Sequence, residues 1–216
     1  MTTLTTEHYV CPSCGNEFDE KIVVSFMHKG QDSDFYPHYL GLNPLPYYLV
    51  QCSKCSFTAY PEDYSEGQAE KFKIKADKIK KIQSLPLAKK LPENALKFFI
   101  TAKIYEEVQV NPYKIGNLYL RASWCCRASE NRKAEIEMQQ LSIKFFKEAV
   151  EKTTISNPDN ALVVSYLVGE LYRRLEDRKL AREWFENVIE SIIDPEQQWL
   201  LELAKKQAEL NEYLLN

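Results

Sequence analysis

The sequence predicts a mainly α-helical protein with a small β-containing module at its N-terminus. Residues 1–64 hold short β-branched and aromatic runs separated by turn-forming residues, a pattern typical of strands. From Glu66 onward, apolar residues recur with helical spacing and lysines occupy many of the positions between them. We therefore expect two domains, at residues 1–64 and 65–216.

Three runs in the first domain are candidate strands: HYV at 8–10, KIVVSF at 21–26 and YYLVQ at 47–51. The stretch 30–46 between the last two runs contains three prolines and two glycines. Such frequent breakers are incompatible with a helix, so we expect this stretch to be irregular.

The second domain is expected to be a series of antiparallel helices. The periodicity predicts helices at about 66–83, 92–109, 112–130, 133–153, 159–175, 178–193 and 195–214. Four prolines lie near the expected helix starts, where the missing N–H costs little. The polar residues that precede three of these prolines are candidate N-caps: Asn111, Asn157 and Asp194.

The helices also carry a repeat pattern typical of tetratricopeptide units. One unit has the full spacing, with the small and aromatic residues Gly169, Tyr172, Ala181 and Phe185. A weaker unit contains Gly116, Tyr119, Phe146 and Ala149. In this interpretation a small residue lets two helices cross closely and an aromatic ring fills the space. A generic helical bundle is the alternative.

Four of the six cysteines form two C-x-x-C pairs, Cys11 with Cys14 and Cys52 with Cys55. Each pair can hold one metal ion from a tight turn whose backbone N–H groups point at the sulfurs. Gly15 suits the left-handed conformation that such a turn often needs. The pairs predict one structural zinc ion in a ribbon-like module that packs on the helical array.

A mononuclear iron site of rubredoxin type has the same four-sulfur ligand set. The second pair lacks the proline and glycine usual in rubredoxins, so zinc is favoured over iron. Four thiolates leave no open coordination position for water, so a catalytic zinc is not expected.

An unusual segment between the cysteine pairs concentrates acids, a histidine and aromatics. Its residues Asp32, Asp34, His38, Tyr39 and Asn43 are candidates for a binding loop. The alternative interpretation is structural, with Asp and Asn capping turns and the aromatics packing the small domain. No nucleophile-and-base arrangement or phosphate-binding loop stands out, so no catalytic residue is assigned.

Two other groups of residues favour a structural interpretation. Adjacent Cys125 and Cys126 favour core packing over a redox pair. Six lysines crowd one expected helix, which favours a solvated face over contact with nucleic acid: Lys71, Lys73, Lys75, Lys78, Lys80 and Lys81.

Composition places the chain among ordinary globular proteins, with 44% hydrophobic and 27% charged residues. The N-terminus has no basic and apolar segments of a secretory signal, and no run approaches the roughly 18 apolar residues that cross a bilayer. In a reducing compartment, two C-x-x-C pairs indicate metal binding and not disulfide bonds. We therefore expect a cytoplasmic location and no membrane partner.

The order of three segments resembles a known bacterial family: CPSCG, then DSDFYPHYLGLNPLPY, then CSKCSFTAY, followed by a helical tail. The chain is similar over its whole length to the family named domain of unknown function 2225. The resemblance implies a cytoplasmic bacterial protein with a zinc-binding front, carried by the four paired cysteines, and repeat-like helices behind it. Ser56 departs from the glycine expected after the second pair, which predicts a strained or differently shaped turn.

The family implies no established activity, so function is inferred from the residues. The leading hypothesis is a protein-interaction module, an adapter or scaffold, that uses its helical surface. The expected partner is a protein, which includes a second copy of the chain. The alternatives are an enzyme that uses the Asp32–Asn43 loop and a nucleic-acid-binding protein that uses the ribbon and the lysine-rich helix.

Overall fold

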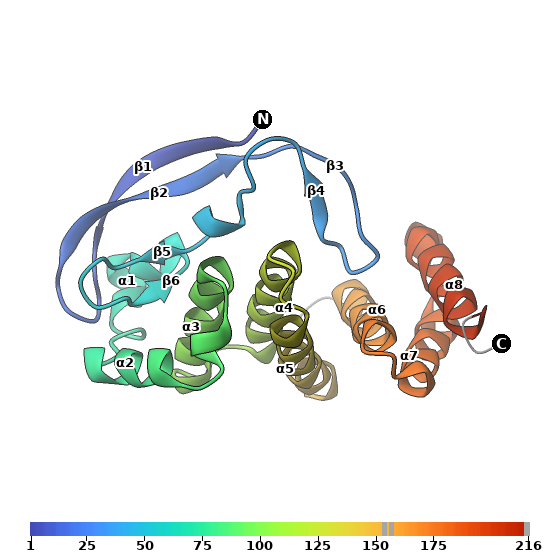
Figure 1. The fold of residues 1–216 in the computed structure, drawn as a ribbon. Helices are drawn as coiled ribbons and strands as arrows, with labels where there is room; N and C mark the ends of the chain where they lie inside the picture. The colour runs from blue at the N-terminus through green and yellow to red at the C-terminus, as the bar shows by residue number, and fades with distance from the viewer. Residues whose placement is uncertain (153–154, 156–157, 214–216) are drawn as a thin grey trace. The chain divides into compact units, whose positions relative to one another are not determined.

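In the computed structural model, which describes residues 1–152, 155 and 158–213, the chain is mainly helical with a β-containing module at its N-terminus (Figure 1). The fold class expected from the sequence is therefore confirmed. None of the described helices combines the length and apolar character needed to span a bilayer.

The chain divides into two compact units. Unit 1 comprises Met1–Gly30, Pro37–Val110 and Leu118–Met138. Unit 2 comprises Gln31–Tyr36, Asn111–Asn117 and Gln139–Asn216. Neither unit coincides with residues 1–64 or 65–216, and the division into those two folding domains stays a prediction.

The described strands form three two-stranded sheets, β1 with β2, β3 with β4 and β5 with β6. Their bounds are β1 Thr3–Val10, β2 Glu17–Ser25, β3 His28–Gln31, β4 Pro37–Tyr39, β5 Val50–Gln51 and β6 Thr58–Ala59. The long β1–β2 hairpin is antiparallel, with Val10 opposite Glu17 and Thr3 opposite Ser25. Both strands are seen side by side in Figure 1.

The run 47–51 is a strand only at its end, which corrects the expectation for its first residues. A 3-10 helix, η1 Leu45–Tyr47, precedes β5. The Asn43 side-chain oxygen accepts a 3.0 Å hydrogen bond from the Leu45 N–H, and Pro44 pre-sets the backbone for a turn. This local capping chemistry overrides the β-propensity of the two tyrosines that follow.

The helices begin and end close to the expected residues. Their bounds are η2 Pro61–Tyr64, α1 Glu66–Ala69, α2 Ala76–Ser84, η3 Ala88–Lys90, α3 Glu93–Glu107, α4 Pro112–Ala128, α5 Arg132–Glu151, α6 Pro158–Arg174, α7 Arg178–Ser191, η4 Pro195–Gln197 and α8 Gln198–Tyr213. The described residues after Ala59 contain no strand, as expected.

Two of the candidate N-caps are confirmed. The Asn111 side chain accepts from the Tyr113 N–H at 2.9 Å, and the Asp194 side chain accepts from the Glu196 N–H at 2.8 Å. Asn157 lies outside the described residues.

The helix expected at 66–83 is wrong in its middle, because α1 ends at Ala69 and α2 begins only at Ala76. Burial alternates from Phe72 to Lys75, which is the period of extended backbone and not of a helix. The Ile74 carbonyl accepts a 2.6 Å hydrogen bond from the Ser13 hydroxyl. In a continuous helix this carbonyl would instead accept from a backbone N–H one turn further along. Tertiary contacts therefore override helical periodicity here.

Each unit has its own core. In unit 1, the fully buried aromatic side chains include Phe57, Phe72, Phe98 and Tyr105. In unit 2, Phe146 and Phe185 are fully buried against glycines of neighbouring helices. A Cβ atom added to Gly116 would lie 2.5 Å from a ring carbon of Phe146, and one added to Gly169 would lie 2.9 Å from a ring carbon of Phe185. The helix pairs thus cross closely at both glycines.

Candidate metal centre

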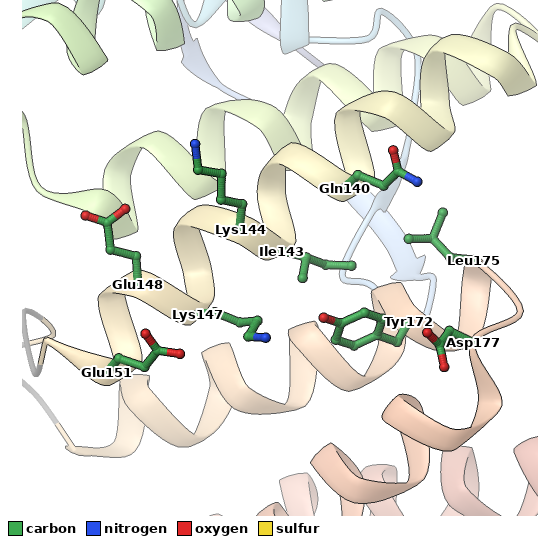
Figure 2. A pocket seen from close by; sticks show the side chains of 9 residues that line it. All are labelled: Gln140, Ile143, Lys144, Lys147, Glu148, Glu151, Tyr172, Leu175 and Asp177. Atoms are coloured by element: carbon green, nitrogen blue, oxygen red, sulfur yellow. The ribbon is translucent and has the colours of Figure 1, made fainter.

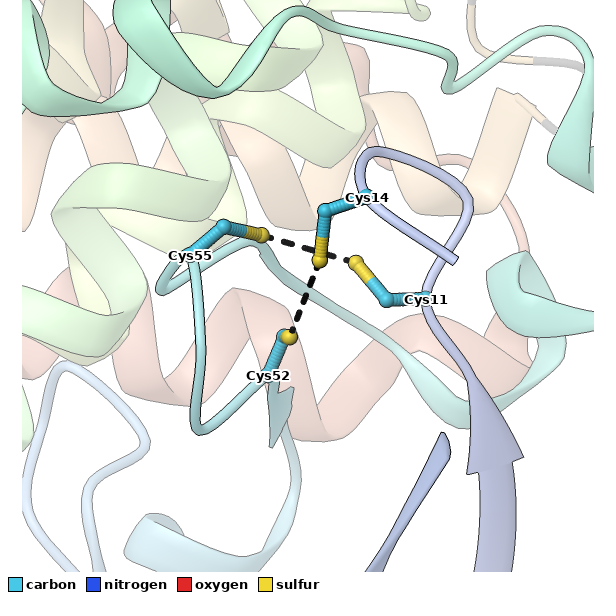
Figure 3. Close-up of side chains that lie close together, drawn as sticks. All are labelled: Cys11, Cys14, Cys52 and Cys55. Atoms are coloured by element: carbon cyan, nitrogen blue, oxygen red, sulfur yellow. Dashed lines mark hydrogen bonds between the residues drawn. The ribbon is translucent and has the colours of Figure 1, made fainter. Parts of the chain in front are cut away.

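The four paired cysteines lie on two hairpin turns of unit 1. Cys11 directly follows β1 and Cys14 lies in the turn that leads to β2. Cys52 directly follows β5, and Cys55 lies in the turn before β6. Figure 3 shows the four sulfurs pointing toward one another from these two turns.

Both turns are closed by the same pair of backbone hydrogen bonds. In the first turn, the Cys11 N–H donates to the Asn16 carbonyl at 2.9 Å and the Gly15 N–H donates to the Cys11 carbonyl at 2.8 Å. The second turn repeats both bonds at equivalent positions, from Cys52 to Phe57 at 2.8 Å and from Ser56 to Cys52 at 2.9 Å. The chain therefore builds one turn shape twice.

The residue after each pair has a left-handed backbone conformation. The φ angle is +67° at Gly15, as expected, and +59° at Ser56. The second turn is thus not shaped differently from the first, although a side chain at positive φ is disfavoured. Ser56 adopts the conformation that the turn requires and bears its conformational cost.

The sulfur positions fit a tetrahedral metal ion. Cys11 Sγ lies 3.5 Å from Cys55 Sγ, Cys14 Sγ lies 3.7 Å from Cys52 Sγ, and all four sulfurs lie within 4.8 Å of one another. A zinc ion bound at about 2.3 Å by four sulfurs implies sulfur–sulfur edges of about 3.8 Å. All four cysteines are free thiols, because a disulfide would need a sulfur–sulfur distance of about 2.05 Å. These residues could therefore hold a metal ion.

The electrostatics of the site call for a cation. Burial raises the pKa of Cys11, against the opposing effect of backbone N–H groups of Ser13 and Cys14 that donate to its sulfur. Burial likewise raises the pKa of Cys55, and the Phe57 N–H opposes it. A bound metal ion would stabilise the thiolates that burial disfavours.

Cys14 is half-buried, whereas the other three cysteines of the cluster are buried, and the pKa of its thiol shifts in the opposite direction. Its burial raises the pKa, but hydrogen bonds from the Asn16 N–H and from neighbouring thiols outweigh this effect, and the pKa is lowered. Donors that are already aimed at a sulfur are the arrangement expected around a metal-bound thiolate.

A buried shell supports the two turns. The Tyr64 hydroxyl contacts the carbonyls of Val50 and Phe57, each at 3.0 Å, and the Tyr64 ring packs edge-on against Phe57. The Ser13 hydroxyl, inside the first turn, donates to Ile74. Sequence reasoning missed Tyr64 and Ile74, because neither lies in a recognisable ligand spacing.

The candidate binding loop is divided between the two units. Asp32 and Asp34 belong to unit 2, where the Asp32 N–H donates to the Tyr36 carbonyl at 2.9 Å and closes a tight turn. Asp34 is fully buried and forms an ion pair with Arg174, with 3.2 Å between Oδ1 and Nη2.

The other three residues of that loop belong to unit 1. His38 is exposed, the Tyr39 ring lies edge-on to Phe26 at 5.5 Å between centroids, and the Asn43 side chain accepts from the Leu45 N–H in the turn before η1. The contacts of Asp34 and Asn43 are of the structural kind. A binding role for this loop stays a prediction.

Cys125 and Cys126 are buried in α4 without a disulfide, which agrees with core packing.

The lysines expected on one helix are divided, because only Lys78, Lys80 and Lys81 lie on α2. The other three lie in the segment between α1 and α2, and the expectation of a single lysine-rich helix face is corrected. Lys78 is paired with Glu107, and Lys73 with Glu70 at 3.6 Å.

Comparison with known protein families assigns the chain to one of them. The model of a family described as an uncharacterized protein conserved in bacteria, DUF2225, matches residues 4–211. No curated protein and no solved structure matches the chain. The matched range contains all four cysteines and nearly every described element, and the chain therefore belongs to the DUF2225 family.

Proposed function

We propose that this protein is a zinc-stabilised protein-interaction module, an adapter or scaffold that works by holding another protein. The observation that carries the proposal is the convergence of four thiols on one point. Four thiolates complete the tetrahedral coordination that zinc prefers, so the ion has no open position for water or substrate. A closed site of this kind suits a structural role and not catalysis.

The shape of the sulfur cluster also fits iron, which takes the same four-sulfur geometry. Zinc is favoured over iron because the second cysteine pair, followed by Ser56, lacks the proline and glycine usual in rubredoxins. A ferric tetrathiolate absorbs visible light strongly and a zinc tetrathiolate does not, so the colour of the purified protein separates the two metals.

A groove between α5 and α6 of unit 2 is the proposed binding surface. It has a volume of about 720 Å³, and its apolar and aromatic lining residues are Ile143, Tyr172 and Leu175. Figure 2 shows Ile143 and Tyr172 facing each other across it. The charged lining residues are Lys144, Lys147, Glu148, Glu151 and Asp177. A groove that combines apolar and charged lining residues offers both kinds of contact that protein interfaces use.

The close helix crossings support a repeat-like surface. Gly116 against Phe146 and Gly169 against Phe185 place a glycine of one helix under an aromatic ring of the next. Stacked helical hairpins of this type present extended surfaces that suit protein segments. We extend the proposal to a tetratricopeptide-like mode of binding.

The metal half of the proposal is tested by elemental analysis of purified protein, which should find about one equivalent of zinc. Cys14→Ser should lose the metal and unfold the N-terminal module while most helical circular dichroism remains. Cys125→Ser is the matched control, since it makes the same chemical change at a buried cysteine that is not a ligand. Metal-free protein with a normally folded N-terminal module would exclude the structural zinc.

The binding half is tested by affinity capture from a bacterial lysate with the full chain as bait. The double variant Lys144→Glu and Lys147→Glu should lose a specific captured protein without loss of folding. The control variant makes the same charge reversal at exposed Lys205 and Lys206 of α8 and should retain capture. Equal capture by both variants would exclude the α5–α6 groove as the binding surface.

A further inference from the structure

A second surface, in unit 1, exposes an unusual amount of apolar side chain. We call it the β2 patch and define it as Val24, Phe26, Met27, Leu40 and Leu42, which are 62%, 37%, 58%, 42% and 49% exposed. The Leu40 N–H donates to the Met27 carbonyl at 2.9 Å, so the two halves of the patch lie together. Contiguous exposed apolar residues on a folded protein indicate an interaction site.

A groove of about 460 Å³ runs beside this patch. One of its walls consists of Tyr47, Tyr48 and Tyr60. The guanidinium of Arg121 lies over the rings of Tyr48 and Tyr60, at 5.4 Å and 5.9 Å from their centroids, and hydrogen-bonds to the Tyr60 hydroxyl. Arg121 therefore holds two of the tyrosines in place before any partner binds.

The opposite wall is a strand edge. Five consecutive residues line the groove from Ile22 to Phe26. Only alternate residues of a regular strand point to one face of a sheet, and the register between β1 and β2 shifts near Val24, so the groove borders an irregular part of the β2 edge. Within the described part of the chain β2 pairs with β1 alone, so no described strand pairs with its other edge, which η1 and β5 approach.

Among the described residues that line the groove one is charged, a carboxylate, while the guanidinium of Arg121 lies over the rings of Tyr48 and Tyr60. Glu62 lines the groove and is exposed, and Glu20 precedes the groove-lining part of β2. Neither carboxylate forms an ion pair with a described residue. A positive charge on a partner would complement them.

We propose that the edge of β2 not paired with β1 binds an extended peptide segment of a partner protein by strand addition. Apolar side chains of the peptide contact the β2 patch and the tyrosines, and a Lys or Arg side chain of the peptide pairs with Glu62. The backbone edge requires an extended chain, the patch requires apolar side chains at alternate positions, and Glu62 requires a cation. This surface is independent of the α5–α6 groove and does not depend on the binding mode proposed there.

The probe is a fluorescein-labelled octapeptide of alternating valine and threonine with arginine at both ends, titrated with the full metal-loaded chain and followed by anisotropy. Saturable binding is expected. Two further peptides carry N-methyl groups on alternate amides, one on each edge of the extended peptide. Because only one edge can pair with β2, one of these should bind about tenfold more weakly and the other should bind normally.

The charge contact is tested by Glu62→Lys, which changes an exposed residue and should leave the fold intact. This variant should weaken the arginine peptide about tenfold and strengthen a matched peptide that ends in glutamate. Glu186→Lys on α7 is the control and should change neither. Amide hydrogen exchange should show protection by the peptide within residues 20–27.

The proposal is overturned if no peptide binds, if both N-methylated peptides bind equally well, or if Glu62→Lys has no effect. Protection of residues 20–27 that grows with protein concentration in the absence of peptide would replace it with self-association through β2. Binding of the patch to phosphatidylserine vesicles, with no peptide binding, would replace it with a membrane surface.

Discussion

The guanidinium of Arg174, near the end of α6, lies 3.2 Å from the carboxylate of Asp34, whose side chain is fully buried. Glu170 joins this network, because it accepts from Arg173 at 2.8 Å and from Arg174 at 2.7 Å. The Ser33 hydroxyl also donates to Glu170 at 2.6 Å. Two carboxylates and two guanidinium groups balance one another, and they fasten the turn at residues 31–36 to α6 within unit 2.

The first prediction concerns this buried network. Asp34→Asn should lower the free energy of unfolding by about 1–3 kcal/mol, because it removes one of the two carboxylates paired with Arg174, which keeps its ion pair with Glu170. Urea unfolding measures the loss. Glu176→Gln, at an exposed carboxylate of the same unit, is the control and should change stability by less than about 0.5 kcal/mol. A cost for Asp34→Asn that is as small as the control would show that the ion pair does not hold the turn.

The two metal turns could be predicted from the sequence, while this network could not. A C-x-x-C pair shows its chemistry because both ligands come from one short turn, and helix periodicity shows in the same local way. Asp34 and Arg174 belong to distant parts of the chain, and no spacing links them. The break between α1 and α2 was missed for the same reason: Phe72 fits a helical pattern, and only its packing against Tyr105, at 5.3 Å between centroids, and the Ser13–Ile74 hydrogen bond show otherwise.

The second prediction compares Gly15 and Ser56, the positions with positive φ in the two metal turns. Ser56→Gly should stabilise the protein by about 0.5–1 kcal/mol, because glycine adopts this conformation without the cost of a Cβ, although it loses more entropy on folding. Gly15→Ser should have the opposite effect and cost about 1 kcal/mol. A Cβ at Gly15 would meet no atom within 4 Å, so this cost is conformational and not steric.

Thermal unfolding of the two metal-loaded variants checks this pair, with metal release to a competing chelator as a second measurement. Stabilities that change in the same direction in both variants would show that backbone strain at these positions does not limit the turns.

The third prediction concerns the helix crossings. Alanine in place of glycine in a helix gains up to about 1 kcal/mol, but overpacking costs about 1–3 kcal/mol. Overpacking should dominate at Gly116, where the added Cβ would lie 2.5 Å from Phe146, and Gly116→Ala should destabilise. At Gly169 the closest ring atom of Phe185 is 2.9 Å away, so Gly169→Ala should cost less. Gly169→Leu should cost a few kcal/mol.

Chemical denaturation of the three variants gives the order of stabilities. Phe185→Leu should partly rescue Gly169→Leu, because it removes the ring that the new side chain meets. A Gly169→Leu variant that unfolds like the parent would refute the close crossing of α6 and α7 and, with it, the proposed repeat-like packing (Figure 1).

The fourth prediction is a loss of stability at alkaline pH that depends on a buried thiol of α4. Burial, followed by the nearby Cys126, raises the pKa of Cys125 to about 12. An unfolded cysteine has a pKa of about 8.5, so between about pH 8.5 and 12 the unfolded state has released a proton that the folded state keeps. The contribution of the neutral buried thiol is therefore fully present below about pH 8.5 and is lost as pH rises, at about 1.4 kcal/mol per pH unit.

The comparison that isolates this effect is between the parent and Cys125→Ala. Between pH 8 and pH 10 the parent should lose about 2 kcal/mol more of its free energy of unfolding than the variant, because alanine has no proton to release. Ser123→Ala is the control, since Ser123 is fully buried on the same helix but does not titrate, and its difference from the parent should not vary over this range. A parent and a Cys125→Ala variant with the same pH dependence would mean that the thiol ionises in the folded protein, which would favour the redox-pair interpretation of Cys125 and Cys126 over core packing.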